Sequence, residues 1–238
     1  WSSDVCSSDL GNCQYEMNVV LRTWLSTYVW QTTTASKRLA DTWGVSQPVA
    51  TRAIAPTGSI GILAGTTTGI EPVFAVAYKR RYLREGTRWA FQYVVDSTAR
   101  EVIDRYGLRP EDVETALSLA KDYRRRIAFQ ADVQDYVDHA ISSTINLPAW
   151  GSPENNEDGV MDFARTLAEF APRLRGFTCY PDGARGGQPI TPVDYQWAME
   201  RLGDVYEEHP HDITASPEIV EGTTDVCDIT GKGGTCGS

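Results

Sequence analysis

The stretch Ala55-Pro56-Thr57-Gly58-Ser59-Ile60-Gly61 joins two segments of different character. Residues 49–54 before it are rich in β-branched side chains and are bounded by prolines, which favours a brief strand. Residues 60–64 at its end are mostly apolar and fit the start of a helix. A turn from a strand into a helix presents unpaired backbone N–H groups beside the positive end of the helix dipole. The stretch is therefore a candidate site for an anion such as a phosphate group.

The side chains of this loop agree with an anion site. Gly58 and Gly61 let a ligand approach the backbone closely, and Thr57 and Ser59 offer hydroxyl donors. Thr-Gly-Ser turns are common, and a turn that only shapes the backbone remains an open alternative. The loop is not a nucleoside-triphosphatase P-loop, because no lysine follows Gly61 as that motif requires. Hydrolysis of nucleoside triphosphates is therefore unsupported.

Helical and extended patterns alternate on both sides of the loop. Apolar residues at helical spacing predict one long helix or two broken ones over residues 15–43, ending at Gly44. Further helices are predicted over 87–106, from residue 110, and over 132–141 and 160–175, with strands over 70–78, 142–148 and 176–180. This alternation indicates an α/β fold with a mainly parallel sheet or barrel. Four strands cannot close a barrel, so either the sheet is open or the rest of the barrel precedes this chain.

Composition and charge limit what the chain can do. The 238 residues are 41% hydrophobic and 23% charged, which is the balance of an ordinary globular protein. No apolar run approaches the roughly 20 residues that cross a bilayer, and no signal peptide opens the chain, so a cytoplasmic protein without membrane contact is expected. The net charge of −10 argues against a nucleic-acid surface. Any phosphate that binds here must be held by local groups.

Two basic clusters, residues 79–81 and 124–126, lie in segments with strand or helix patterns. The ordinary explanation for such a cluster is a solvated charged face, and we expect it for both. Tryptophans at helical spacing are more often core residues than a platform for a cofactor. Those in question are Trp24, Trp30, Trp43 and Trp89. His139 is expected to lie at the surface or to have its hydrogen bonds satisfied.

The two ends of the chain differ in composition from its middle. Residues 1–10 repeat the unit Ser-Ser-Asp and resemble a translated sequencing adapter, so they are excluded from the fold together with Cys6. Residues 206–238 have few apolar side chains, which is typical of a flexible tail. The five cysteines are too scattered for a disulfide framework, so reduced thiols are expected. The folded part is therefore expected over residues 11–205.

Residues 52–72 (RAIAPTGSIGILAGTTTGIEP) resemble the phosphate-binding segment of ribonucleotide reductase large subunits in their class II form. Further matches follow in the family's order at residues 142–148 and 176–187, so the resemblance covers the chain from about residue 13 onward. It implies the C-terminal part of a ten-stranded α/β barrel, incomplete in this chain, with a flexible tail. It also implies that one run of residues contacts the diphosphate or triphosphate of a ribonucleotide substrate. That run is Pro56, Thr57, Gly58, Ser59 and Ile60.

The resemblance further implies reduction of ribonucleotides to deoxyribonucleotides, with adenosylcobalamin generating a thiyl radical on a cysteine. In the family that cysteine lies in an Asn-x-Cys-x-Glu loop. The nearest candidate is Asn12-Cys13-Gln14-Tyr15-Glu16, but its spacing is wrong at both ends and it lies too close to the phosphate loop. The chain is therefore expected to lack it. Class I relatives carry adjacent tyrosines where this chain has Cys179-Tyr180, which agrees with a radical made in place by cobalamin. A packed strand residue is an equally open explanation.

Cys227 and Cys236 lie in a polar, glycine-containing tail, where exposed thiols can take part in disulfide exchange. The resemblance implies that such a tail re-reduces the active-site cysteine pair and is itself reduced by thioredoxin or a similar thiol reductant. Two alternatives for these cysteines remain open: a zinc site with His209 and His211, or no role at all. Thiol exchange is the expected role, so no bound metal is expected. The full-length enzyme is expected to form a homodimer. The alternative to an enzyme is a non-enzymatic module that binds a phosphate ligand and carries a thiol or zinc-binding tail.

Overall fold

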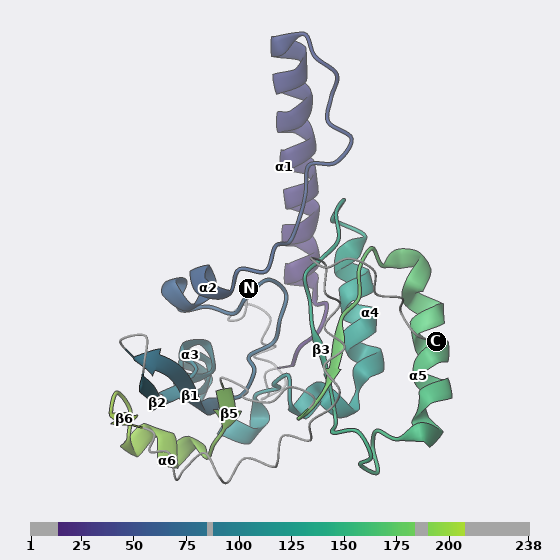
Figure 1. The fold of residues 1–238 in the computed structure, drawn as a ribbon. Coiled ribbons are helices and arrows are strands. Elements are labelled where there is room, and N and C mark those ends of the chain that lie inside the picture. The colour runs from purple at the N-terminus through teal and green to yellow at the C-terminus, as the bar shows by residue number, and fades with distance from the viewer. Residues whose placement is uncertain (1–13, 85–87, 184–189, 208–238) are drawn as a thin grey trace, which may run out of the picture.

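A computed structural model describes residues 14–84, 88–183 and 190–207 of the chain. The adapter-like segment at 1–10, Cys13 and the tail with Cys227, Cys236, His209 and His211 lie outside the described residues. Figure 1 shows one long helix, α1, that extends away from the rest of the protein. Two groups of elements lie at its base. On one side are α2 (Gly58–Ala64), α3 (Ser97–Tyr106) and a β-hairpin, and on the other are α4 (Tyr123–Gln134), β3 (Ile145–Leu147) and α5 (Val160–Phe170).

Helix α1 (Val19–Trp43) is unbroken and ends where the sequence predicts. The side chain of Asn18 accepts a hydrogen bond from the backbone N–H of Leu21 at its start, and Gly44 ends it in the left-handed conformation at φ 63°. Its inner turns bury Leu21 and Leu25 against Phe129 and neighbouring side chains of α4. These inner turns of α1 therefore belong to the core, and Ala40 near its outer end is also buried.

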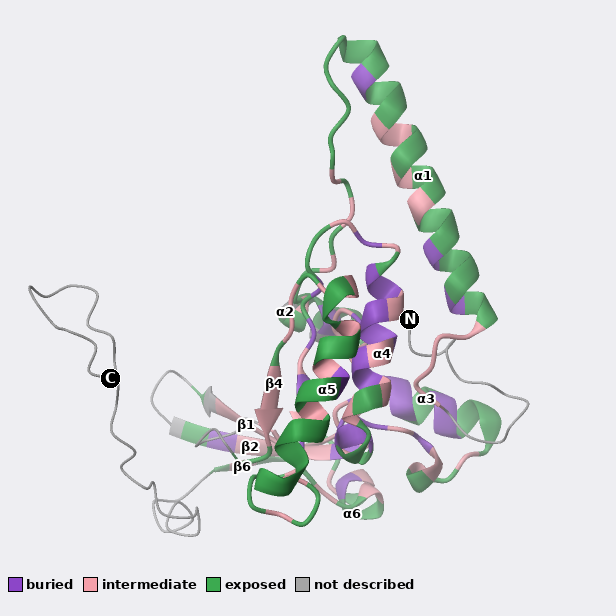
Figure 2. Ribbon diagram, turned by 90° about the vertical axis from the view of Figure 1, so that its right-hand side faces the viewer, coloured by how far each residue is buried: buried purple, intermediate pink, exposed green. Residues whose placement is uncertain are grey.

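The tryptophans expected in the core are exposed. Trp30 and Trp43 are 63% and 69% accessible, and Trp24 and Trp89 are each more than two-fifths accessible. Figure 2 shows most of α1 as exposed, with few buried positions along its length. The prediction was wrong because helical spacing identifies an apolar face but not whether another element of the chain covers it.

One group of elements is built around α4 (Tyr123–Gln134), which starts at Asp122 and crosses the centre of the core. Ile127 on this helix packs against Ile145 and Leu147 of the strand β3 (Ile145–Leu147). Strand β4 (Cys179–Pro181) pairs in parallel with β3, and α5 (Val160–Phe170) packs on α4. The parallel α/β part of the fold, including the strands expected near residues 142–148 and 176–180, is confirmed here.

The other group is an antiparallel sheet that the sequence analysis did not anticipate. Its strand order is β5-β1-β2-β6. The bounds are β5 (Ile190–Pro192), β1 (Ala77–Arg84), β2 (Arg88–Val95) and β6 (Val205–Glu207). Strand β6 spans the expected boundary between the folded part and the tail. The expectation of a mainly parallel sheet was therefore wrong for the described residues.

The predicted helix over 87–106 is a strand followed by a helix. The strand is β2, and the helix is α3 (Ser97–Tyr106), which ends at Gly107 as expected. Asp96 separates them, because its side chain accepts hydrogen bonds from the N–H groups of Thr98 and Ala99 and so starts the helix. Helix α6 (Tyr195–Glu200) buries Ala198 against the sheet residues Ala77 and Val95.

Other short elements also differ from expectation. The strand over 49–54 is only an isolated parallel bridge between Ile54 and Ile141, and the strand over 70–78 begins at Ala77. The helix from residue 110 is a single 3-10 turn, and of the helix predicted over 132–141 only residues 132–134, the end of α4, are helical. The 3-10 turns are η1 (Pro110–Asp112), η2 (Ser118–Lys121), η3 (Glu157–Gly159) and η4 (Ala171–Arg173).

Candidate functional site

The loop at residues 55–61 turns directly into the short helix α2 (Gly58–Ala64), as the sequence predicts. The N–H of Gly61 donates to the carbonyl of Thr57 over 2.7 Å, which closes the first helical turn. The hydroxyl oxygen of Thr57 accepts a hydrogen bond from the backbone N–H of Gly69 over 3.0 Å. The start of α2 is thus tied to a residue twelve positions further along the chain.

The two glycines of the loop have different surroundings. A Cβ atom at Gly61 would lie 2.9 Å from Cγ2 of Thr68 and 3.2 Å from the carbonyl oxygen of Thr66, which is too close. A Cβ atom at Gly58 would meet nothing within 4 Å. Gly61 is therefore required for packing, whereas Gly58 leaves open space next to the backbone, as an incoming ligand requires.

Gly58 borders a cleft of about 590 Å³ that lies between the loop and the two sheets. Pro56 and Gly58 line it from the loop, Tyr78 and Arg80 from β1, and Asn146 from β3. A cleft of this size suits a nucleotide-sized ligand. The antiparallel hairpin, which the sequence analysis missed, therefore supplies one wall of the candidate site.

The five loop residues singled out from the sequence are divided between two sides of the loop. Pro56 and Gly58 face the cleft, whereas Thr57 and Ile60 line a separate hollow beside Trp24 of α1. The backbone of Ser59 lies in α2, and its side chain is outside the described part of the structure. The geometry therefore brings together Pro56 and Gly58, and Arg80 lines the same cleft from β1.

Three charged residues line the cleft: Glu71, Asp96 and Arg80. The side chain of Asp96 starts α3, and burial raises the pKa of this carboxyl although hydrogen bonds from the N–H groups of Ala99 and Thr98 oppose the shift. One oxygen of Glu71 is paired with a buried arginine. Both carboxylates are therefore occupied by contacts within the protein.

The partner of Glu71 is Arg126, whose side chain is only 3% accessible. Nη2 of Arg126 lies 2.7 Å from Oε2 of Glu71 and donates to the carbonyl of Thr144, and the N–H of Thr144 donates to Oε1 of Glu71. The guanidinium also lies over the ring of Tyr15, 4.8 Å from its centroid. The expectation of a solvated face was wrong for Arg126, because its charge is compensated by a carboxylate 55 positions away in the sequence.

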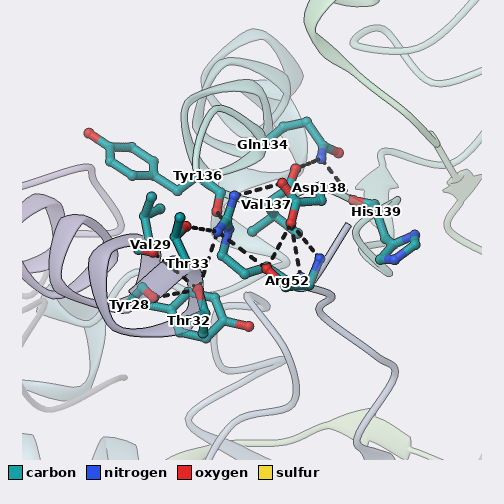
Figure 3. Close-up of polar contacts among 11 residues, drawn as sticks. Tyr28, Val29, Thr32, Thr33, Arg52, Gln134, Tyr136, Val137, Asp138 and His139 are labelled. Atoms are coloured by element: carbon teal, nitrogen blue, oxygen red, sulfur yellow. Dashed lines mark hydrogen bonds and ion pairs between the residues drawn. The ribbon is translucent and has the colours of Figure 1, made fainter. Parts of the chain in front are cut away.

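A second ionic cluster holds the segment that leads into the loop (Figure 3). Nη2 of Arg52 lies 2.6 Å from Oδ1 of Asp138, and Nη1 donates to the hydroxyls of Thr32 and Thr33 on α1. The other carboxylate oxygen of Asp138 accepts from the N–H groups of Thr51 and Arg52. This Arg52 cluster joins α1, the segment that follows α4 and the approach to the loop. His139 beside it is exposed, as expected.

Cys179 and Tyr180 lie in β4, and Tyr180 pairs with Asn146 of β3 at the edge of the cleft. Cys179 is half-buried, and burial raises the pKa of its thiol. A raised pKa favours the protonated thiol and disfavours nucleophilic chemistry at pH 7. Cys179 packs against the cluster of Ile127, Ile145 and Leu147, as expected for a packed strand residue.

Within the described residues, no three His, Cys, Asp or Glu side chains are grouped so that they could hold a metal ion. The same part of the chain contains no helix that is both long and apolar enough to cross a membrane.

Sequence reasoning missed Arg80, Glu71 and Arg126 as residues of the site. Glu71 lies inside the quoted segment 52–72, and its position directly after the glycine-rich turn was the available signal. Arg80 and Arg126 were assigned to surface clusters. Their roles depend on which strand or helix faces them, and local spacing does not contain that information.

Comparisons with known proteins place the chain in a family. The sequence model of the family described as "Ribonucleotide reductase, barrel domain" matches residues 31–168. A "Vitamin B12-dependent ribonucleoside-diphosphate reductase" of Mycobacterium tuberculosis (strain ATCC 25618 / H37Rv) is 34% identical over 155 residues, covering 58% of this chain and 21% of the relative. A protein of the same name from Thermoplasma acidophilum is 31% identical over 161 residues, covering 59% of this chain and 20% of the relative.

A solved structure described as a B-12 dependent (class II) ribonucleotide reductase shares the fold. The TM-score is 0.59 at 15% sequence identity, and the match covers 78% of this chain and 27% of that one. The chain spans only about a fifth of the length of the two curated relatives.

Proposed function

The chain belongs to the family of ribonucleotide reductase barrel domains, and from that premise we propose that it is part of an adenosylcobalamin-dependent enzyme that reduces ribonucleotides to deoxyribonucleotides. The cofactor is proposed because the matching relatives are named as vitamin B12-dependent. The described residues line a nucleotide-sized cleft. The part played by these residues is to hold the substrate.

The proposed site for the substrate phosphates is the loop formed by Pro56, Thr57, Gly58, Ser59 and Ile60. The observation that carries the proposal is the free space at Gly58, beside backbone at the start of α2 and open to the cleft. The bond between Thr57 and Gly69 holds this backbone in place before a ligand arrives, which lowers the entropic cost of binding.

A matched pair of substitutions at Gly58 tests this proposal. Gly58→Glu and Gly58→Gln have side chains of nearly the same size at a position where a Cβ atom meets nothing within 4 Å, but only glutamate adds a negative charge. We expect the glutamate variant to bind ADP at least tenfold more weakly than the glutamine variant, measured by calorimetry on this chain, because like charges repel in a partly buried site. Equal affinities of the two variants would contradict a phosphate site at the loop.

For the tail we propose thiol exchange through Cys227 and Cys236, with thioredoxin or a similar reductant as partner. In the full-length enzyme, Cys227→Ser should abolish turnover with thioredoxin but retain it with a small dithiol that reaches the active-site pair directly. Equal loss with both reductants would refute the exchange role. We also propose that the full-length enzyme is a cytoplasmic homodimer, which sedimentation of the purified enzyme would test.

A further inference from the structure

The loop has a charge problem that its own residues do not solve. Residues 55–61 contain no lysine or arginine, yet a nucleoside diphosphate carries several negative charges, and the whole chain has a net charge of −10. Two further carboxylates, Glu71 and Asp96, line the same cleft. Backbone N–H groups alone would have to bind the phosphates in an unfavourable field. A cation within the cleft would offset the charge of the phosphates.

Arg80 is the one cationic residue among the described residues that line this cleft. It lies on β1, and strand alternation places it on the same face as Tyr78, which also lines the cleft. Its neighbours Lys79 and Arg81 lie on the opposite face, where they stack on the rings of Phe91 and Trp89. The basic cluster is thus divided, and one of its three charges is directed to the cleft side of the sheet.

The guanidinium of Arg80 is oriented by the protein but not saturated. Nη2 donates to Oε1 of Gln92 over 3.1 Å, and Gln92 is its register partner on β2. Nε is buried and has no hydrogen-bond partner in the structure. Because Nε is shielded from solvent, a ligand in the cleft can reach the guanidinium only through its terminal nitrogens. A phosphate oxygen is a suitable acceptor for those terminal N–H groups.

We infer that Arg80 binds the phosphate groups of the nucleotide from the wall of the cleft opposite the loop. The inference rests on the proposed phosphate role of the loop and adds the charged contact that the loop lacks. Arginine suits this task because its planar guanidinium offers several donors to phosphate oxygens at once. Gln92 is then a positioning residue, since it fixes the guanidinium without reaching the ligand.

The test measures binding of ADP and of uncharged adenosine to this chain by calorimetry, without divalent cations. We expect Arg80→Gln to weaken ADP binding by about tenfold to a hundredfold, as for the loss of a hydrogen bond to a charged group. Arg80→Lys should recover part of the affinity. Arg81→Gln is the matched control, because it removes the same charge from the opposite face of the strand, and its ADP affinity should stay within about twofold of the unmodified chain. Adenosine binding should not respond to any of the three.

The possible failures are distinguishable. If the Gly58 pair differs as expected but Arg80→Gln binds ADP like the unmodified chain, the inference about Arg80 is wrong and the loop proposal stands. If the unmodified chain does not bind ADP, both fail. A second measurement covers the case in which Arg80→Gln does not fold. The affinity of the unmodified chain for ADP should fall as sodium chloride is added, and a flat salt dependence would overturn the charged contact.

Discussion

The hydroxyl oxygen of Thr57 accepts a hydrogen bond from the backbone N–H of Gly69 over 3.0 Å, so that the two ends of the glycine-rich segment are joined. Replacing Thr57 with valine keeps the shape of the side chain and removes the acceptor. We expect Thr57→Val to lower the free energy of unfolding by about 1 kcal/mol, because the N–H of Gly69 then loses its partner. Urea denaturation measures the loss. Thr57→Ser, which keeps the hydroxyl, should lose less, and an identical loss in both variants would argue against this bond.

A comparison of alanine substitutions at the two loop glycines tests the packing of α2. Gly61→Ala places a methyl group 2.9 Å from Cγ2 of Thr68 and should destabilise the protein by roughly 1–3 kcal/mol, as overpacked sites do. Gly58→Ala meets no atom within 4 Å and should be neutral or slightly stabilising, because alanine favours helix. Thermal denaturation of the two variants shows which of them is less stable. The reverse order would mean that α2 packs differently.

Two arginines of the same helix, α4, are predicted to differ sharply in their contribution to stability. Arg126→Met leaves Glu71 without its buried partner and should cost about 3–5 kcal/mol. Arg124→Met removes a pair with Glu169 in which both side chains are about half exposed, and it should cost at most about 1 kcal/mol. Chemical denaturation of both variants at one pH tests this. Similar losses would show that burial of Arg126 does not govern its contribution.

The Arg52 cluster predicts an acid-sensitive contribution to stability. The backbone N–H of Thr51, then that of Arg52 and its guanidinium, hold the pKa of Asp138 below its ordinary value. A carboxyl with a lowered pKa adds stability above its unfolded-state pKa of about 4, and that stability is lost as the pH falls through the folded-state pKa. Asp138→Asn should therefore be roughly 1 kcal/mol less stable than the unmodified chain at pH 7.

The difference between Asp138→Asn and the unmodified chain should narrow as the pH falls from about 5 towards 3, because Asp138 then becomes protonated in both states. Urea midpoints across this range measure it. Asp104→Asn, in an exposed pair with Arg100, serves as the control and should show a smaller difference at every pH. A difference that does not change with pH would show that the charge of Asp138 is not what holds the cluster.

Local signals predicted those parts of the fold that local interactions determine. Gly44 and Gly107 end α1 and α3 as expected, because a helix stop needs only the left-handed conformation of one residue. The amphipathic helix α5 and the parallel pair β3–β4 were also found. The stretch that became β2 was assigned to a helix because its apolar residues continue the spacing of α3, although Asp96 marks the boundary between them.

The candidate site was predicted only on its loop side. The family resemblance identified residues 56–60, but the opposite wall depends on a hairpin whose strands pair from Ala77 with Val95 to Arg84 with Arg88. Long-range partners decide the roles of the charged residues there. Arg126 is buried because Glu71 meets it, and no pattern within α4 indicates that contact.

Helix α1 combines an inner part that packs on α4 with an outer part in which Ala40 is buried but most side chains are exposed. Arg52 contacts it at Thr32 and Thr33, and beyond these residues the helix ends at Trp43 beside the returning chain (Figure 1). Segments with few buried contacts open at lower free energy than the core. Amide hydrogens near Trp43 should therefore exchange with solvent much faster than those near Leu25. The hydrogen bonds of Arg52 to Thr32 and Thr33 mark where this local unfolding should stop. We therefore expect the outer turns of α1 to unfold and refold while Arg52 keeps its contact with Asp138.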